Sequence, residues 1–128
     1  MDLDIVPDDN EANVERLASA LITLDATVRE AGARRLPVSR ETLIETAQAK
    51  HGGQLRLRTN CGPLDVLWRL HDGQGYVDLL PRTVVLSDDE RRVRVVDVTT
   101  LIEIKTRAGR MRDRDDVAIL TRIKNLSR

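Results

Sequence analysis

Aromatic residues are almost absent from this sequence, which contains no phenylalanine, one tryptophan and one tyrosine. A hydrophobic core must therefore be built from leucine, valine, isoleucine and alanine, and the hydrophobic share of 41% allows a core of modest size. Cysteine is equally scarce, because Cys61 is alone; this excludes an internal disulfide framework and indicates a reducing compartment. We expect Cys61 to be a small residue buried in a turn rather than a nucleophile.

The sequence also lacks a net charge and a long apolar run. It has 21 basic and 21 acidic residues, so no overall attraction to nucleic acid or to a membrane surface is expected. The charges are unevenly placed, with acids gathered at 2–15 and Lys and Arg gathered at 91–114. There is no signal peptide and no apolar segment of membrane-spanning length, which predicts a cytoplasmic protein without a membrane partner.

Length and hydrophobic periodicity predict a single domain over residues 1–128. The predicted strands cover 3–7, 27–29, 54–59, 64–70, 83–86 and 93–96, and the predicted helices cover 8–24, 39–50, 76–80, 97–108 and 113–123. Strands and helices do not alternate regularly along the chain. The predicted fold class is therefore mixed α/β or α+β, a mixed β-sheet flanked by helices.

The segment Thr59–Leu70 carries an unusual acid. It begins with a predicted tight turn at Gly62-Pro63 and continues as a short strand that is apolar around Asp65. A lone carboxylate inside an apolar strand is costly unless another group pairs with it. Two interpretations are open: Asp65 points to solvent from the open face of the sheet, or it faces a metal ion or another cation.

Two more acids, Asp2 and Asp4, lie in the first predicted strand. Because they are two residues apart, they share one face of a strand. Two carboxylates on one face repel each other unless a divalent cation lies between them, and oxygen ligands suit Mg²⁺. The alternative is that both are flexible N-terminal acids in water.

Four segments together resemble the nucleotidyltransferase fold of the DNA polymerase β superfamily, and are most similar to small bacterial proteins of the abortive-infection and toxin–antitoxin type. They are DLDIVPD at Asp2–Asp8 with the helix that follows, TNCGPLDVL at Thr59–Leu67, VVDVTTLIEIKT at Val95–Thr106, and AGRMRDRDDVAIL at Ala108–Leu120. The likeness lies in their order and spacing and covers nearly the whole chain.

The resemblance implies a set of site residues. In such enzymes, two carboxylates of a D-x-D strand and a third from a neighbouring strand hold divalent metal, which here would be Asp2, Asp4 and Asp65 with Mg²⁺ or Mn²⁺. Lys105 resembles the family's lysine near the nucleotide phosphates. Arg110 matches the arginine of an R-x-x-D segment and would contact phosphate, while Asp113 of that segment is either part of the site or only a helix cap.

One departure from the family pattern is clear. The family places a helix with a Gly-Ser or Gly-Gly turn before the D-x-D strand, whereas Met1 directly precedes Asp2 here. The resemblance therefore predicts a nucleotidyltransferase-like fold that is truncated at its N-terminus. A missing helix and strand would leave sheet surface uncovered, which predicts a homodimer formed through the exposed sheet edge.

Two functions follow from the resemblance. The first is Mg²⁺-dependent transfer of a nucleoside monophosphate from an NTP to an acceptor hydroxyl on RNA, protein or a small molecule. The second is a catalytically degenerate module that keeps the fold and acts by binding nucleotide or protein, for example within a toxin–antitoxin system. The sequence leaves open whether the chain is an enzyme.

Overall fold

The computed structural model describes residues 3–29, 36–49 and 53–126. The chain divides into two compact units, residues 1–78 and residues 79–128, and each is described by itself. The sequence predicts that the whole chain folds as a single domain, and this stays a prediction.

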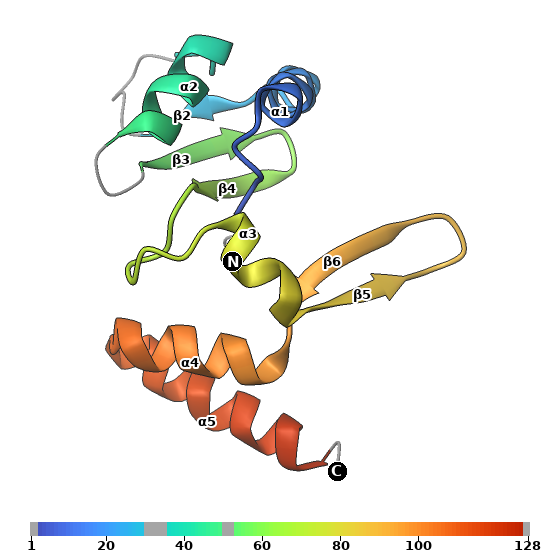
Figure 1. The fold of residues 1–128 in the computed structure, drawn as a ribbon, viewed down its shortest axis with the longest axis vertical. Helices are drawn as coiled ribbons and strands as arrows, with labels where there is room; N and C mark the ends of the chain where they lie inside the picture. The colour runs from blue at the N-terminus through green and yellow to red at the C-terminus, as the bar shows by residue number, and fades with distance from the viewer. Residues whose placement is uncertain (1–2, 30–35, 50–52, 127–128) are drawn as a thin grey trace. The chain divides into compact units, whose positions relative to one another are not determined.

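A four-stranded mixed sheet forms the centre of the first unit (Figure 1). Its strands are β1 (Leu3–Ile5), β2 (Thr27–Val28), β3 (Gln54–Thr59) and β4 (Gly62–Leu67). They lie in the order β1-β4-β3-β2; β1 runs parallel to β4, and the β2–β3 and β3–β4 pairs are antiparallel. The predicted α+β class with a mixed sheet is confirmed.

Two helices cover one face of this sheet (Figure 1). The helix α1 (Glu11–Thr23) begins after Asn10, whose side chain accepts a hydrogen bond from the backbone N–H of Asn13. The helix α2 (Arg40–Gln48) begins after Ser39, which caps Thr42 in the same way. These short polar caps satisfy N–H groups that have no partner inside the helix. Each helix is amphipathic, so its apolar side packs on the sheet.

Apolar and polar residues alternate along β3, and this pattern shows which face of the sheet borders the core. Leu55 and Leu57 are buried, whereas the arginines between and beside them are exposed, so one face of β3 is apolar and the other is polar. Their partners on β4 are Val66 and Leu64. The core residues come from the two helices, the two central strands and their flanks: Val14, Ala18, Leu21, Ala26, Val38, Leu43, Leu55, Leu57, Leu64, Val66 and Trp68. As the composition requires, this core is almost entirely aliphatic.

The turn between β3 and β4 differs from its prediction. The strands pair as far as Thr59 and Gly62, so Asn60 and Cys61 form the turn and Gly62-Pro63 already belong to β4. Gly62 has φ 115°, a conformation that glycine adopts readily, so this glycine serves the start of β4 rather than the turn. The predicted burial of Cys61 is also wrong, because it is exposed at the tip of the hairpin.

The second unit contains a hairpin followed by two helices. The short helix α3 (Tyr76–Leu79) lies at the boundary between the units. The 3-10 helix η1 (Leu80–Arg82) then leads into the antiparallel strands β5 (Thr83–Ser87) and β6 (Arg92–Val96). The helix α4 (Val98–Ala108) is capped by Asp97 and ends at Gly109, which has φ 66°. The helix α5 (Met111–Leu126) begins two residues earlier than the sequence predicted. The left-handed glycine lets the chain reverse between α4 and α5.

Few side chains are buried in the second unit. In the part that the structure describes, the buried ones are Leu79, Thr100 and Asp113, and many apolar side chains of the hairpin and of α5 are exposed. Small cores give little stability, and this unit leaves much of its apolar surface exposed. In the described ranges, no helix has the length and apolar composition needed to cross a bilayer.

A buried hydrogen bond between Trp68 and Thr46 gives a direct test of the first unit. The Trp68 Nε1–H donates to Thr46 Oγ1 over 2.9 Å, and Thr46 Oγ1 donates in turn to the Thr42 carbonyl. Replacing Thr46 with valine leaves the indole N–H without its acceptor at a site that is 3% exposed. We expect Thr46→Val to lower the free energy of unfolding by about 1–3 kcal/mol, measured in urea by the fluorescence of the chain's single tryptophan.

The matched control for this measurement is Thr23→Val. Thr23 also donates its hydroxyl to the carbonyl four residues earlier, but it is exposed and lies on α1. Its loss is expected to change stability by about 0.5 kcal/mol or less. Equal effects of the two substitutions would contradict a structural role for the Trp68 hydrogen bond.

Candidate functional site

The pairing of β1 with β4 brings two predicted site residues together. In this parallel pair, Asp4 lies directly opposite Asp65. Residues opposite each other in a sheet share a face, and Leu64 and Val66 on either side of Asp65 face the buried core. Asp4 and Asp65 therefore share the face of the sheet that the helices α1 and α2 do not cover.

Asp65 is buried and paired with an arginine. Its side chain is 12% exposed, and its Oδ1 accepts a hydrogen bond from Nη2 of Arg29, whose side chain is 22% exposed. Arg29 is held in place immediately after β2, because its backbone N–H donates to the carbonyl of Arg56 over 2.9 Å. Of the two interpretations of Asp65, the open solvent-facing one is wrong. The carboxylate faces a cation, and the structure identifies that cation as a guanidinium.

A second arginine lies on the other side of Asp65. Arg56 on β3 is directly opposite Asp65 on β4. Asp4, Asp65, Arg56 and Arg29 thus form a line across four neighbouring backbone segments, which we call the charged row. The two acids come from one side of the sheet and the two bases from the other. Within a sheet, opposite charges on facing positions stabilise the pairing of the strands.

The third predicted metal ligand, Asp2, lies outside the described residues. The other two predicted ligands differ in their access to solvent, because Asp4 is exposed and Asp65 is buried. In the ranges 3–29, 36–49 and 53–126, no group of three or more His, Cys, Asp or Glu side chains is arranged to hold a metal. The predicted metal site of three carboxylates therefore stays a prediction.

The two predicted nucleotide-binding cations, Lys105 and Arg110, belong to the second unit. Lys105 Nζ lies 2.8 Å from Oδ2 of Asp116 and 3.9 Å from Oδ1 of Asp113. Arg110 donates from Nε to Asp113 Oδ2 over 2.7 Å and from Nη2 to Oδ1 over 3.3 Å. Both cations thus have carboxylate partners within the α4–α5 pair, and the structure brings them together around Asp113.

Asp113 is the centre of this second cluster. Its side chain is 1% exposed, and Oδ2 also accepts from the backbone N–H of Arg110 over 3.1 Å. A carboxylate three residues into a helix that binds back to the capping residue stabilises the helix start. The hydrogen bonds from the Arg110 side chain and backbone, and the charges of Arg110 and Lys105, hold the pKa of Asp113 below its usual value. Helix capping, one of the two predicted roles of Asp113, is confirmed.

Sequence analysis missed three charged partners. Arg29 and Arg56 belong to the charged row, and Asp116 is the nearest carboxylate to Lys105. The alternation of apolar and polar residues in β3 already placed Arg56 on the polar face. The sequence did not show the register that sets Arg56 opposite Asp65. For Arg29 there was no signal, because its side chain passes over the neighbouring strand β3 to reach Asp65 on β4.

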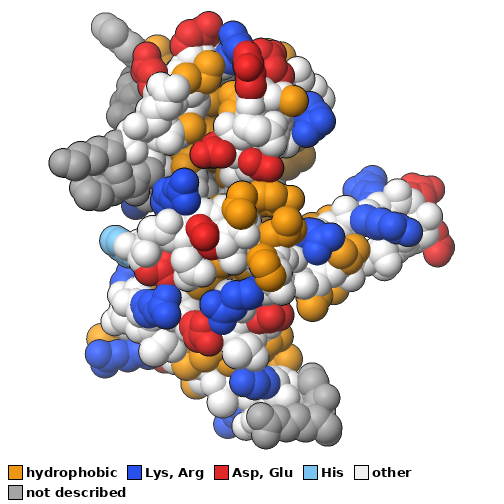
Figure 2. All heavy atoms as spheres, viewed as in Figure 1, with side chains coloured by type: hydrophobic (Ala, Val, Ile, Leu, Met, Phe, Trp, Pro, Cys, Tyr) orange, Lys and Arg blue, Asp and Glu red, His pale blue; other side chains and the backbone are white. Residues whose placement is uncertain are grey.

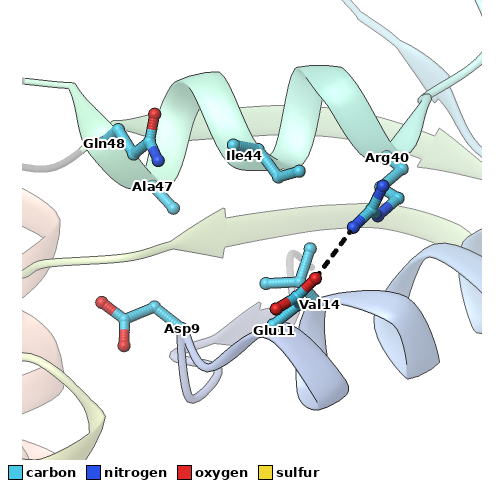
Figure 3. Close-up of a pocket in the computed structure, with 7 residues that line it drawn as sticks. All are labelled: Asp9, Glu11, Val14, Arg40, Ile44, Ala47 and Gln48. Atoms are coloured by element: carbon cyan, nitrogen blue, oxygen red, sulfur yellow. Dashed lines mark hydrogen bonds and ion pairs between the residues drawn. The ribbon is translucent and has the colours of Figure 1, made fainter.

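Two hollows in the first unit lie away from the charged row. A groove of about 410 Å³ runs between α1 and α2, where Arg40 on α2 reaches across to Glu11 on α1 (Figure 3). Asp9 and the apolar side chains of Val14, Ile44 and Ala47 also line it. Because both helices lie on the other face of the sheet, this groove does not adjoin Asp4 and Asp65. A smaller hollow of about 130 Å³ lies beyond the carboxyl ends of β1 and β4, lined by residues that include Pro7, Trp68 and Tyr76.

Comparison with known proteins adds no assignment: no family model, no curated protein and no solved structure matches the chain. What the candidate site can do must therefore be argued from its own residues.

The Arg29–Asp65 pair predicts a strong dependence of stability on each partner. Removing one charge leaves the other desolvated, so we expect Arg29→Met to lower the free energy of unfolding by about 3 kcal/mol. The double variant Arg29→Met with Asp65→Leu should be more stable than the sum of the single variants predicts, because neither charge is then left alone. Urea unfolding followed by Trp68 fluorescence measures all four proteins of this cycle.

The control is Arg58→Met, because Arg58 lies on the same face of β3 as Arg56 and its side chain is exposed. If the effects of the Arg29 and Asp65 substitutions on the free energy of unfolding were additive, the two side chains would not be coupled.

The lowered pKa of Asp113 predicts how the second unit responds to acid. Because this pKa is lower in the folded protein than in the unfolded chain, the carboxylate contributes stability above its unfolded value of about 3.9. That contribution is lost as the pH falls through the folded pKa. We expect Asp113→Asn to lower the thermal midpoint at pH 7, measured by circular dichroism at 222 nm, and the difference from wild type to shrink as the pH approaches 3.

The control for the acid experiment is Asp115→Asn, since Asp115 is exposed and lies in the same helix. This variant should follow the wild type at every pH. If the difference between wild type and Asp113→Asn were constant from pH 7 to pH 3, the ionised carboxylate would not be the stabilising group.

Proposed function

We propose that this chain is a nucleotidyltransferase-like protein that binds an NTP with Mg²⁺ and transfers the nucleoside monophosphate to an acceptor hydroxyl. The observation that supports this most is the register of β1 and β4, which sets Asp4 opposite Asp65 on the face of the sheet that α1 and α2 do not cover. The D-x-D and P-L-D-V segments that suggested the family from sequence are the two segments that this pairing joins.

The described residues fit a divalent cation in their donor chemistry. Asp4 and Asp65 offer carboxylate oxygens from adjacent strands, and Mg²⁺ is commonly held by one or two carboxylates together with substrate phosphates. When bound, Mg²⁺ would neutralise negative charge on the phosphates and steady the leaving pyrophosphate.

The chain's own residues have separate tasks in this proposal. Asp4 and Asp65 are the metal-holding acids, with Asp2 as the third acid expected from the family. Arg29 fixes the direction of the Asp65 carboxylate, because its hydrogen bond engages Oδ1. Arg29 is therefore a positioning residue.

Lys105 and Arg110 are the proposed phosphate-binding residues. Their side chains are 26% and 60% exposed, so an anionic ligand can reach both while their carboxylate partners hold them in place. The guanidinium of Arg110 presents its donors in a plane, which suits the oxygens of a phosphate. The acceptor hydroxyl belongs to RNA, a protein side chain or a small molecule.

A second candidate is a module that keeps the fold without catalysis, for example within a toxin–antitoxin system. The observation that favours it is that Asp65, Lys105 and Arg110 already have ionic partners within the chain. Charged side chains that pair with one another within the chain stabilise its fold without any bound ligand. This module would act by binding nucleotide or protein.

The test is a thermal-shift titration with each NTP, with and without Mg²⁺, followed by a transfer assay that measures pyrophosphate release. A ligand at about 100 times its Kd stabilises a protein by about 2.7 kcal/mol, which raises the midpoint of a domain of this size by several degrees. We expect a shift that requires Mg²⁺ and is lost in Asp4→Asn. Asp4 is the better target than Asp65, because its exposed side chain can be changed without breaking the buried ion pair.

The control is Asp89→Asn, an exposed acid in the loop between β5 and β6, which should bind as the wild type does. Pyrophosphate release that depends on Mg²⁺ and Asp4 would support the enzyme. Binding without release would contradict the enzyme and support the second candidate as a nucleotide-binding module. The absence of any shift with all four nucleotides would contradict the enzyme and leave the second candidate only as a protein-binding module.

A further inference from the structure

The hairpin of β5 and β6 exposes an apolar surface that its own unit does not cover. The two strands form a two-stranded sheet, and the pairing sets Val84 opposite Val95 and Leu86 opposite Val93. These four side chains share one face of the hairpin. Val84, Leu86 and Val93 are 46%, 58% and 57% exposed. An isolated two-stranded hairpin is marginally stable in water, so a further strand would stabilise it.

The two outer edges of the hairpin differ in their protection. Along β6, Arg92 and Arg94 alternate with valines, and charged residues on an edge strand discourage pairing with another chain. Along β5 the sequence is Thr-Val-Val-Leu-Ser, which contains neither charge nor proline. In the described part of the chain, β5 pairs only with β6, so its other edge is an uncharged template for a strand.

The sequence of β5 is complementary to itself. If two copies pair antiparallel with Val85 opposite Val85 of the partner subunit, Val84 faces Leu86 of the partner subunit and Thr83 faces Ser87 of the partner subunit. Branched apolar pairs and Thr–Ser pairs are favourable cross-strand neighbours. The pairing is confined to Thr83–Ser87, because Arg82 before it pairs with Glu103 and the Asp88 carboxylate after it accepts hydrogen bonds within the hairpin turn.

Other arrangements are less favourable. Pairing β6 with itself about its central residue sets Arg94 against Arg94 of the partner subunit, and like charges opposite each other destabilise a sheet. Moving the β5 register so that Leu86 lies on the axis sets Val84 against Asp88 of the partner subunit. The register centred on Val85 pairs every residue of β5, whereas an axis at Val84 or at Leu86 leaves part of the strand unpaired. Figure 2 shows acidic side chains at the far end of the hairpin and basic ones along it.

We propose that β5 pairs with β5 of a second copy of this chain, forming a continuous four-stranded sheet across a two-fold axis at Val85. This interface differs from the dimer expected from sequence, which used the sheet edge of the N-terminal strand. It is also independent of the proposed function, because it uses no residue of the charged row or of the Asp113 cluster. The occupant is a second copy because every residue of β5 finds a favourable cross-strand partner in the same strand of another copy.

The first measurement is the molar mass of the full chain by light scattering over a range of concentrations, where a dimer is expected. Val85→Glu should weaken the dimer by about tenfold or more, because two like charges meet on the axis. Within one copy this glutamate lies opposite Arg94, a favourable pair, so the hairpin itself is retained. Val85→Lys should also weaken the dimer, but its lysine lies opposite Arg94 within one copy, a like-charge pair, so retention of its fold is checked before its mass is interpreted.

Mixing the two variants gives the sharpest result. Val85→Glu and Val85→Lys in equal amounts should form a mixed dimer, because opposite charges then meet at the axis. No other register pairs these two positions, so this rescue reports the proposed contact itself. Circular dichroism of each variant alone confirms that the loss of the dimer is not a loss of fold.

The matched control is Val93→Lys, which changes a valine of similar exposure on the same hairpin but on β6. Edge pairing predicts that Val93→Lys remains a dimer, whereas stacking of the apolar faces predicts that it dissociates. A wild-type protein that is monomeric at all concentrations, a dimer that Val85→Glu leaves intact, or a mixture of the Glu and Lys variants that stays monomeric would each overturn the proposal.

Discussion

The ion pair between Arg29 and Asp65 connects the local structure of the first unit to its candidate site. A carboxylate on a central strand is tolerated because a guanidinium from the end of β2 passes over β3 to meet it. The strand β2 has only two residues, so this contact also holds the edge of the sheet in position. The Arg29–Asp65 ion pair thus holds the β2 edge of the sheet and orients the Asp65 carboxylate beside Asp4.

The pairing register of β3 with β4 gives the sheet one apolar face and one charged face. Leu55 and Leu57 place one side of β3 in the core, and Arg56 between them lies opposite Asp65 on the other side. A slip by one residue would move Asp65 into the aliphatic core and the leucines into water, so the register is strongly specified. The same constraint that builds the core therefore brings the acids and arginines of the charged row together.

Much of this architecture was readable from sequence because it depends on local patterns. The alternation at Gln54–Thr59, the cap at Ser39 and the glycine after Ala108 each act within a few residues. The partners of Asp65 and Lys105 were not readable, since they depend on which strands and helices become neighbours. The turn before β4 was misplaced by about two residues because Gly62 adopts its positive φ inside the strand. The nucleotidyltransferase resemblance itself rests on sequence segments and stays a proposal.

The pairing of β1 with β4 has a consequence for how the site forms in time. The β3–β4 hairpin joins neighbouring segments, whereas β1 must return from the start of the chain so that Leu3 can pair with Leu64. Contacts so distant in sequence close slowly, because the loop between them loses entropy first. A three-residue edge strand is then among the last elements to dock and among the first to open. The neighbourhood of Asp4 and Asp65 exists only while β1 is docked, so a local opening, without global unfolding, is enough to separate the two acids.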